Sequence, residues 1–186
     1  MKHAACSMLL LAVAQTASAE VIENLDHIDY TATPRRGQTL RQALDAASPI
    51  REEGKLYHGY TKWHVRWNFR WWREADGRCR ITEVTTHLDL DITLPELEGG
   101  TPAMQERFAR FREALSEHED GHAQIARDAA ESVDQDILDL PEMASCELLE
   151  ETANQLGHEH LDAAGRKSKR YDRDTEHGRS QGASPD

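Results

Sequence analysis

A chain of 186 residues with 34 acidic and 22 basic side chains carries a formal net charge of −12, and 38% of its residues are hydrophobic. This length fits one domain, with a core large enough to fold without several disulfides. The negative charge repels polyphosphate chains and anionic membranes, so we expect no nucleic acid among the partners. The oligomeric state does not follow from composition.

The first 19 residues have the features of a secretory signal peptide. Lys2 precedes an apolar run from Ala4 to Ala14, and Ala17 and Ala19 form an A-x-A cleavage site before Glu20. The apolar run is too short to span a bilayer, and no later stretch is apolar enough. We therefore expect a secreted or periplasmic protein without stable membrane insertion, cleaved after Ala19.

Cleavage would leave two cysteines, Cys79 and Cys146. Two thiols in an oxidising compartment are more often paired than free, which favours a disulfide between them. The bridge would close a long loop and tie the strand region to the helical region.

Two segments have the alternation of half-buried strands, one over 61–71 and one over 80–94. Asp76-Gly77 between them is a hairpin signal, so the two strands should pair antiparallel. Residues 82–94 are interpreted as a sheet edge on which an extended peptide aligns. A short strand at 27–33 and a short helix at 38–47 come first. The apolar face of the strand over 61–71 is expected to pack beneath the helices. It consists of Trp63, Val65, Trp67, Phe69 and Trp71.

Two helices are predicted in the second half of the chain. Thr101-Pro102 offers a cap and a proline at the first helical position, and the apolar spacing then continues to residue 137. A second helix is expected to start at Pro141. The domain should span residues 20–178, followed by a flexible tail over 179–186.

The long helix carries the segment His118-Glu119-Asp120-Gly121-His122, which matches H-E-x-x-H. Residues i and i+4 lie on one helix face, so two imidazoles can hold one Zn²⁺ ion. The hydrophobic spacing places both histidines on the core side of the helix. Glu119 would then be the general base that takes a proton from a zinc-activated water during hydrolysis of a peptide bond.

Several motifs together resemble a known family. They are the Trp-rich strand WHVRWNFRW, the helix with HEDGHAQIA, a Cys in the next helix, and YDRDTEHG at 171–178. With these motifs the chain is similar to bacterial predicted secreted zinc-dependent proteases, grouped as a domain of unknown function, DUF922. The resemblance implies a zincin-like α+β domain, with a hairpin or small sheet packed on the H-E-x-x-H helix and a second antiparallel helix.

The third zinc ligand has several candidates. His177 belongs to the family-like YDRDTEHG segment and ranks first, and His160 ranks second because an antiparallel helix pair about Pro141 would bring it level with the motif. Tyr171 is a candidate oxyanion donor, and Asp172 is a candidate for orienting a histidine or for the ligand itself. The remaining ligand candidates are Asp128, Glu150, Glu151 and Glu159.

The sequence thus predicts a secreted zinc metallopeptidase acting on a peptide or protein substrate. Two alternatives remain open at this point. One is a zinc-binding envelope module without turnover, and the other is a zinc amidase that acts on cell-wall peptides. Glu119 argues against the first, because a structural zinc needs no carboxylate beside its histidines.

Overall fold

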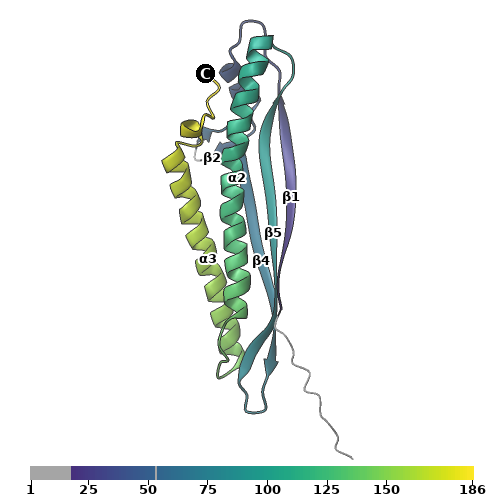
Figure 1. Ribbon diagram of the computed structural model, residues 1–186, viewed down its shortest axis with the longest axis vertical. Coiled ribbons are helices and arrows are strands. Elements are labelled where there is room, and N and C mark those ends of the chain that lie inside the picture. Colours follow the sequence, from purple (N-terminus) through teal and green to yellow (C-terminus); the bar gives the residue numbers. More distant parts are fainter. Residues whose placement is uncertain (1–17, 53) are drawn as a thin grey trace, which may run out of the picture.

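The computed structural model describes residues 18–52 and 54–186 of the chain. It is an α+β fold in which a small mixed sheet lies against two long antiparallel helices (Figure 1). The predicted signal peptide lies outside the described residues except for Ser18 and Ala19, which begin the first strand. In the described part, no helix is both long enough and apolar enough to cross a membrane.

The main sheet has three strands in the order β1–β5–β4, with bounds Ser18–Ala32, Cys79–Leu97 and Tyr60–Arg73. Strand β4 pairs antiparallel with β5, as the sequence predicts, whereas β1 pairs parallel with it. The prediction that residues 82–94 form a sheet edge is wrong, because β1 and β4 flank β5 on both sides. β1 is also longer than the predicted 27–33. The sequence does not indicate its first half, because that half is largely exposed and shows no clear alternation.

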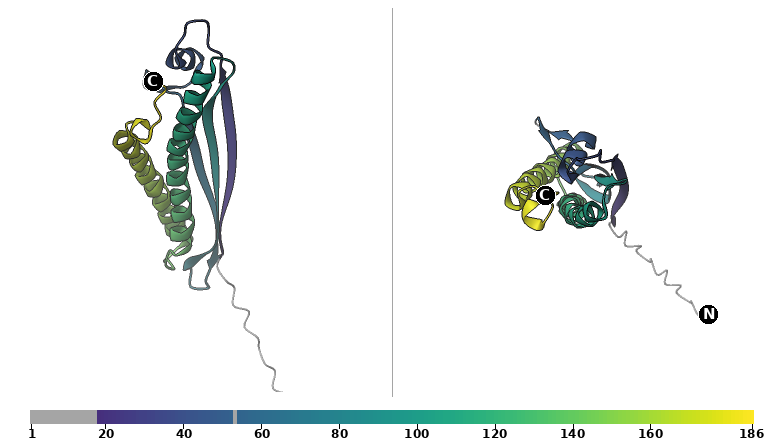
Figure 2. Two further views of the ribbon diagram at one scale, coloured as in Figure 1. Left: turned by 45° about the horizontal axis from the view of Figure 1, so that its top comes forward. Right: turned by 90° about the horizontal axis from the view of Figure 1, so that it is seen from above.

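From Val84 to Leu94, strand β5 buries every second residue under the helices, and this alternation places the core. Helix α2 (Pro102–Leu138) covers the sheet face on which these buried residues lie, and α3 (Cys146–Thr175) packs beside α2 (Figures 1 and 2). The opposite face of β4 and β5 carries ion pairs such as Arg66–Asp89, and β1 exposes Ile22 and Ile28 on that side. The main buried cluster joins the two layers through Val65, Leu88, Leu90, Ile92, Phe108, Phe111 and Leu115.

The Trp-rich strand faces the helices over most of its length. Trp67 donates from Nε1 to the Asn154 side chain at 3.1 Å. A Cβ built on Gly157 would lie 2.4 Å from the Trp67 ring. Only glycine at this position therefore allows α3 to approach the indole so closely. Trp71 does not follow the prediction and is 41% exposed. The register shifts between Arg70 and Trp71, which turns the end of β4 out of the core-facing alternation.

Local capping explains where the helices begin. Thr39 forms a capping box with Gln42 at the start of α1 (Leu40–Ala47), and Thr101 caps α2 through the Met104 amide. The predicted start of the second helix at Pro141 is wrong. Ser145 accepts a hydrogen bond from the Leu148 amide, and α3 therefore begins at Cys146.

Two short segments complete the end of the molecule near α1. Strands β2 (Arg51–Glu52) and β3 (Lys55–Leu56) form a small antiparallel ribbon. Residues 179–186, expected as a flexible tail, instead include the 3₁₀ helix η1 (Arg179–Gln181). Pro185 is buried, and Asp186 forms a two-pronged ion pair with Arg41 of α1. The end of the chain therefore packs back on the domain.

The predicted disulfide between Cys79 and Cys146 is present. It joins the start of β5 to the first residue of α3, with the two Cα atoms 5.0 Å apart and 67 residues of sequence separation. Met143 pairs with Cys79 through two backbone hydrogen bonds of 2.8 and 2.9 Å, which align the connection between α2 and α3 with the sheet.

We expect that replacing both Cys79 and Cys146 by serine lowers the free energy of unfolding by up to about 4 kcal/mol, the chain-entropy value for a loop of this length. Urea unfolding of the oxidised protein and of the double variant measures the difference. Intact mass of the unreduced protein should show no thiol that reacts with an alkylating agent. Two reactive thiols in native protein would contradict the assigned bridge.

Candidate metal centre

Helix α2 carries three adjacent polar side chains into the interior. His118, Glu119 and His122 are 3%, 4% and 8% exposed. They continue the apolar stripe of Phe111 and Leu115 by one and two turns, so the helix buries them with the core. Three polar groups in such a position need partners, because an unpaired buried polar group is costly.

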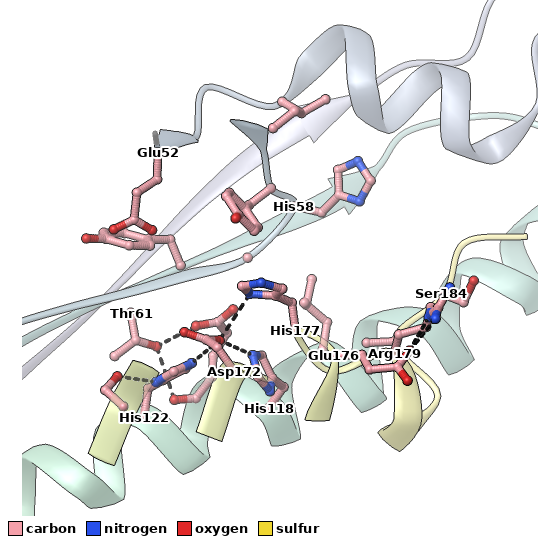
Figure 3. Close-up of a pocket in the computed structure, with 18 of the residues that line it drawn as sticks. Glu52, His58, Thr61, His118, His122, Asp172, Glu176, His177, Arg179 and Ser184 are labelled. Atoms are coloured by element: carbon pink, nitrogen blue, oxygen red, sulfur yellow. Dashed lines mark hydrogen bonds and ion pairs between the residues drawn. The ribbon is translucent and has the colours of Figure 1, made fainter. Parts of the chain in front are cut away.

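The two imidazoles meet one carboxylate from α3. Oδ1 of Asp172 lies 3.0 Å from Nε2 of His122 and 3.3 Å from Nε2 of His118 (Figure 3). Nδ1 of His177 reaches the same oxygen at 3.3 Å from the turn after α3. Three imidazole nitrogens therefore lie within 3.3 Å of one carboxylate oxygen.

The opposite nitrogen of each α2 histidine is fixed by another residue. Nδ1 of His118 lies 3.0 Å from Oε1 of Gln181, and Nδ1 of His122 lies 2.7 Å from the hydroxyl of Ser168. A bound metal ion would replace the hydrogen bonds from Nε2 to Asp172, and both Nδ1 atoms would then donate in these contacts and leave the Nε2 lone pairs for the metal. Outer hydrogen bonds of this kind orient metal-binding histidines in proteins.

His118, His122 and Asp172 fit a divalent metal ion. Their ligand atoms all lie within 4.8 Å of one another. In a tetrahedral site with bonds of about 2.0 to 2.1 Å, neighbouring ligand atoms are separated by about 3.3 Å, close to the nitrogen–oxygen distances here. Two imidazoles and one carboxylate are a donor set that zinc accepts, with a fourth position open.

The charges at this point reinforce one another. Partial burial opposes ionisation of Asp172, but hydrogen bonds with His118 and His122 hold the pKa of its carboxyl well below the usual range. Burial by itself lowers the pKa of His118, whereas the contacts with Asp172, Glu119 and Gln181 raise it overall. The site thus combines an ionised carboxylate with one imidazole, His118, whose positive form is favoured, and a bound cation would supply positive charge at the same place.

Glu119 is held beside this point by strand β4. The Thr61 hydroxyl donates to Oε2 of Glu119 at 2.8 Å, with the Glu119 backbone oxygen 3.1 Å away. A Cβ on Gly59 would lie 2.5 Å from Oε1, so the absence of a side chain there leaves room for the carboxylate. Burial raises the pKa of Glu119, although Thr61 and the histidines act in the opposite direction.

Tyr171 packs against the motif from α3. Its ring stacks on His118 at 5.0 Å between centroids and meets the His122 ring edge to face at 5.1 Å. Its hydroxyl accepts from Nε2 of Gln181 at 3.0 Å. These contacts favour a packing role for Tyr171 beneath the histidines over the role of an oxyanion donor. A Cβ on Gly121 would lie 2.3 Å from the Tyr171 hydroxyl, which explains the glycine inside the motif.

The candidates for the third ligand lie at different distances from the two histidines of α2. His177 lies at the site, but its side chain is 46% exposed and its ring rests on Tyr57. His160 is not at the site, because it pairs with Asp136 of α2 at 2.8 Å. Asp172 follows His160 by 172 − 160 = 12 residues, or about three helical turns, and it is Asp172 that lies level with the motif.

The other acidic candidates have partners away from the site or lie exposed on α3. Asp128 binds Lys167 and Gln124, and Glu159 accepts from Gln155. Glu150 and Glu151 are exposed on α3. Three supporting residues, Thr61, Ser168 and Gln181, have no signal in the sequence, because each is a common polar side chain brought to the site only by packing.

A cavity of about 430 Å³ opens above the candidate metal centre. It is bounded by α2, α3, the chain from Leu56 to Trp63, and the final residues from Ala183 to Pro185. His118, Glu119, His122, Asp172 and His177 all line it, so the candidate ligands are accessible from outside.

Residues 28–178 match the family model described as a bacterial protein of unknown function, DUF922. The chain belongs to this family. No curated protein and no solved structure matches it. The matched region contains the H-E-x-x-H motif and both candidate ligands of the YDRDTEHG segment, whereas Gln181 lies beyond it.

Replacing Gly121 by alanine should disturb the centre by pushing Tyr171 away from the two histidines. We expect a loss of about 1–3 kcal/mol in the free energy of unfolding, the usual cost of forcing extra atoms into a packed site. Gly165→Ala in α3 is the matched control, since a Cβ there meets no atom within 4 Å. Thermal unfolding of both variants tests this, and equal melting temperatures would argue against the close Tyr171 contact.

Proposed function

We propose that this protein is an exported zinc-dependent peptidase, with His118, His122 and Asp172 as its metal ligands and Glu119 as its general base. The observation that carries the proposal is the convergence of two Nε2 atoms and one carboxylate oxygen on a single point at the floor of a cavity. A carboxylate that binds no histidine, Glu119, lies beside that point. This combination is typical of hydrolytic metal centres that keep one position open.

Zinc bound at this point would polarise a substrate carbonyl and lower the pKa of a water molecule. The protein's own residues would perform the rest of the reaction. Gln181 and Ser168 hold the imidazoles in position through their Nδ1 atoms. Thr61 occupies one carboxylate oxygen of Glu119, which leaves Oε1 to accept a proton. Burial raises the pKa of Glu119 and so makes it a stronger base than an exposed glutamate.

An extended peptide is the substrate that the cavity favours. Strand β4 pairs with β5 along one edge, and within the described residues no strand pairs with its other edge. Tyr60, Thr61 and Trp63 at the start of β4 line the cavity. A peptide that adds as a strand along this free edge would pass over the metal point and next to Glu119. β4 therefore takes the role that the sequence assigned to residues 82–94.

The ligand set is tested by zinc titration of single variants. We expect Asp172→Ala to lower zinc affinity by more than the roughly 10–100-fold that loss of an outer partner costs. His177→Ala should have a smaller effect because its side chain is half exposed, and His160→Ala should have none. If His177→Ala weakens binding more than Asp172→Ala does, His177 is the third ligand and Asp172 supports it.

The role of the base is tested by Glu119→Gln. This variant should keep about one zinc per chain, since both imidazoles and Asp172 remain, but its hydrolysis of a peptide library should fall by about 100-fold or more. Glu117→Gln, an exposed position on the same helix, is the matched control and should keep full activity.

Equal activity in Glu119→Gln would overturn the assignment of the base. Zinc binding without hydrolysis of any peptide by the unaltered protein would instead favour the binding-module alternative. Activity confined to cell-wall peptides would favour the amidase.

A further inference from the structure

Helix α2 buries a second carboxylate, Asp134, at the end remote from the candidate metal centre. Asp134 is 3% exposed, and the Thr86 hydroxyl donates to its Oδ1 at 2.9 Å. Across residues 18–52 and 54–186, no Lys, Arg or His forms an ion pair with it. A buried carboxylate without a cation is costly, by several kcal/mol for an isolated ion. Burial accordingly raises the pKa of Asp134.

The backbone of Glu20 lies next to this carboxylate. Strand β1 pairs with β5 so that Glu20 is opposite Thr85 and Val21 is opposite Thr86, the residue that binds Asp134. Hydrogen bonding by the Glu20 backbone lowers the pKa of Asp134, whereas the negative charge of the Glu20 side chain raises it. Glu20 is the residue that follows the A-x-A sequence, and residues 18–20 are exposed at the start of β1.

We propose that Asp134 is a binding site for the α-ammonium group of Glu20, which forms when the leader is removed after Ala19. A signal peptidase would use one water molecule to hydrolyse the Ala19–Glu20 bond. The leader departs with a carboxylate on Ala19, and the amine released on Glu20 takes up a proton at neutral pH.

The new charge appears at the nitrogen that already lies beside Asp134. A neutral amide with one hydrogen is replaced by an ammonium group with three, so processing supplies the cation that Asp134 lacks. The mature chain would therefore gain an ion pair between the exposed start of β1 and the buried Asp134 carboxylate, which the precursor does not have. Asp134 is separated from His122 by 134 − 122 = 12 residues, about three turns of α2. The inference is independent of any metal or activity.

The experiment compares three forms of the protein that differ at the amino terminus. One begins at Glu20 with a free amine, one begins at Glu20 with the amine acetylated, and one begins at Ser18. Each is prepared with Asp134 and with Asp134→Asn, and the unfolding equilibrium is measured in urea at pH 7. The acetylated form is the matched control, because it keeps every residue and strand pair and removes only the charge.

We expect acetylation to increase the unfolding equilibrium constant at least tenfold with Asp134 and less than threefold with Asp134→Asn. Such a cycle isolates the interaction between the two groups. Asp136→Asn, an acidic position nearby on α2 that pairs with His160, should leave the effect of acetylation unchanged. Equal stability of the free and acetylated forms with Asp134 would overturn the proposal, as would an undiminished effect in Asp134→Asn.

A second measurement keeps the proposal testable if Asp134→Asn does not fold. The amine of Glu20 should react with an acetylating reagent at least tenfold more slowly than the amine of the form that begins at Ser18, because the ion pair holds it protonated and partly covered. Equal rates would overturn the proposal. Sequencing of exported protein should also begin at Glu20, and a different first residue would equally exclude this pairing.

Discussion

The candidate site depends on the register in which α3 packs on α2. Asp136 faces His160, Asp128 faces Lys167, and His122 faces Asp172, so the helices run antiparallel with a nearly constant offset. This offset is fixed at the far end of the pair, where Ser145 caps α3 and the Cys79–Cys146 bridge ties it to the sheet. A shift of α3 by one turn would remove Asp172 from both histidines.

Burial then requires that each polar group at the site has a partner. The histidines are held through Nδ1 by Ser168 and Gln181, and Glu119 is held by Thr61. These partners come from α3, η1 and β4, so three elements far apart in sequence converge on one turn of α2. The last residues of the chain fold back on the domain, and this brings Gln181 of η1 to His118.

Helix α2 contributes both to the hydrophobic core and to the buried polar sites. It supplies the apolar layer over β5, and it buries two carboxylates, Glu119 and Asp134, on the same side. Each carboxylate binds a threonine from the sheet, Thr61 on β4 and Thr86 on β5. The sheet therefore positions both acids, and glycines at 59 and 121 provide the space that the larger groups around the motif need.

The sequence by itself determined those features that depend on local patterns. The alternation of β4 and β5, the cap at Thr101, the disulfide and the inward face of the H-E-x-x-H motif all follow from periodicity, residue type and composition, and the structure confirms them. The parallel pairing of β1 could not be predicted, because its exposed first half lacks an alternating pattern. The choice between Asp172, His177 and His160 also required the tertiary structure. That choice depends on the offset between two helices, which no local pattern fixes. A straight pair about Pro141 would bring His160 opposite the motif, whereas in the structure Asp172 lies there and His160 faces Asp136.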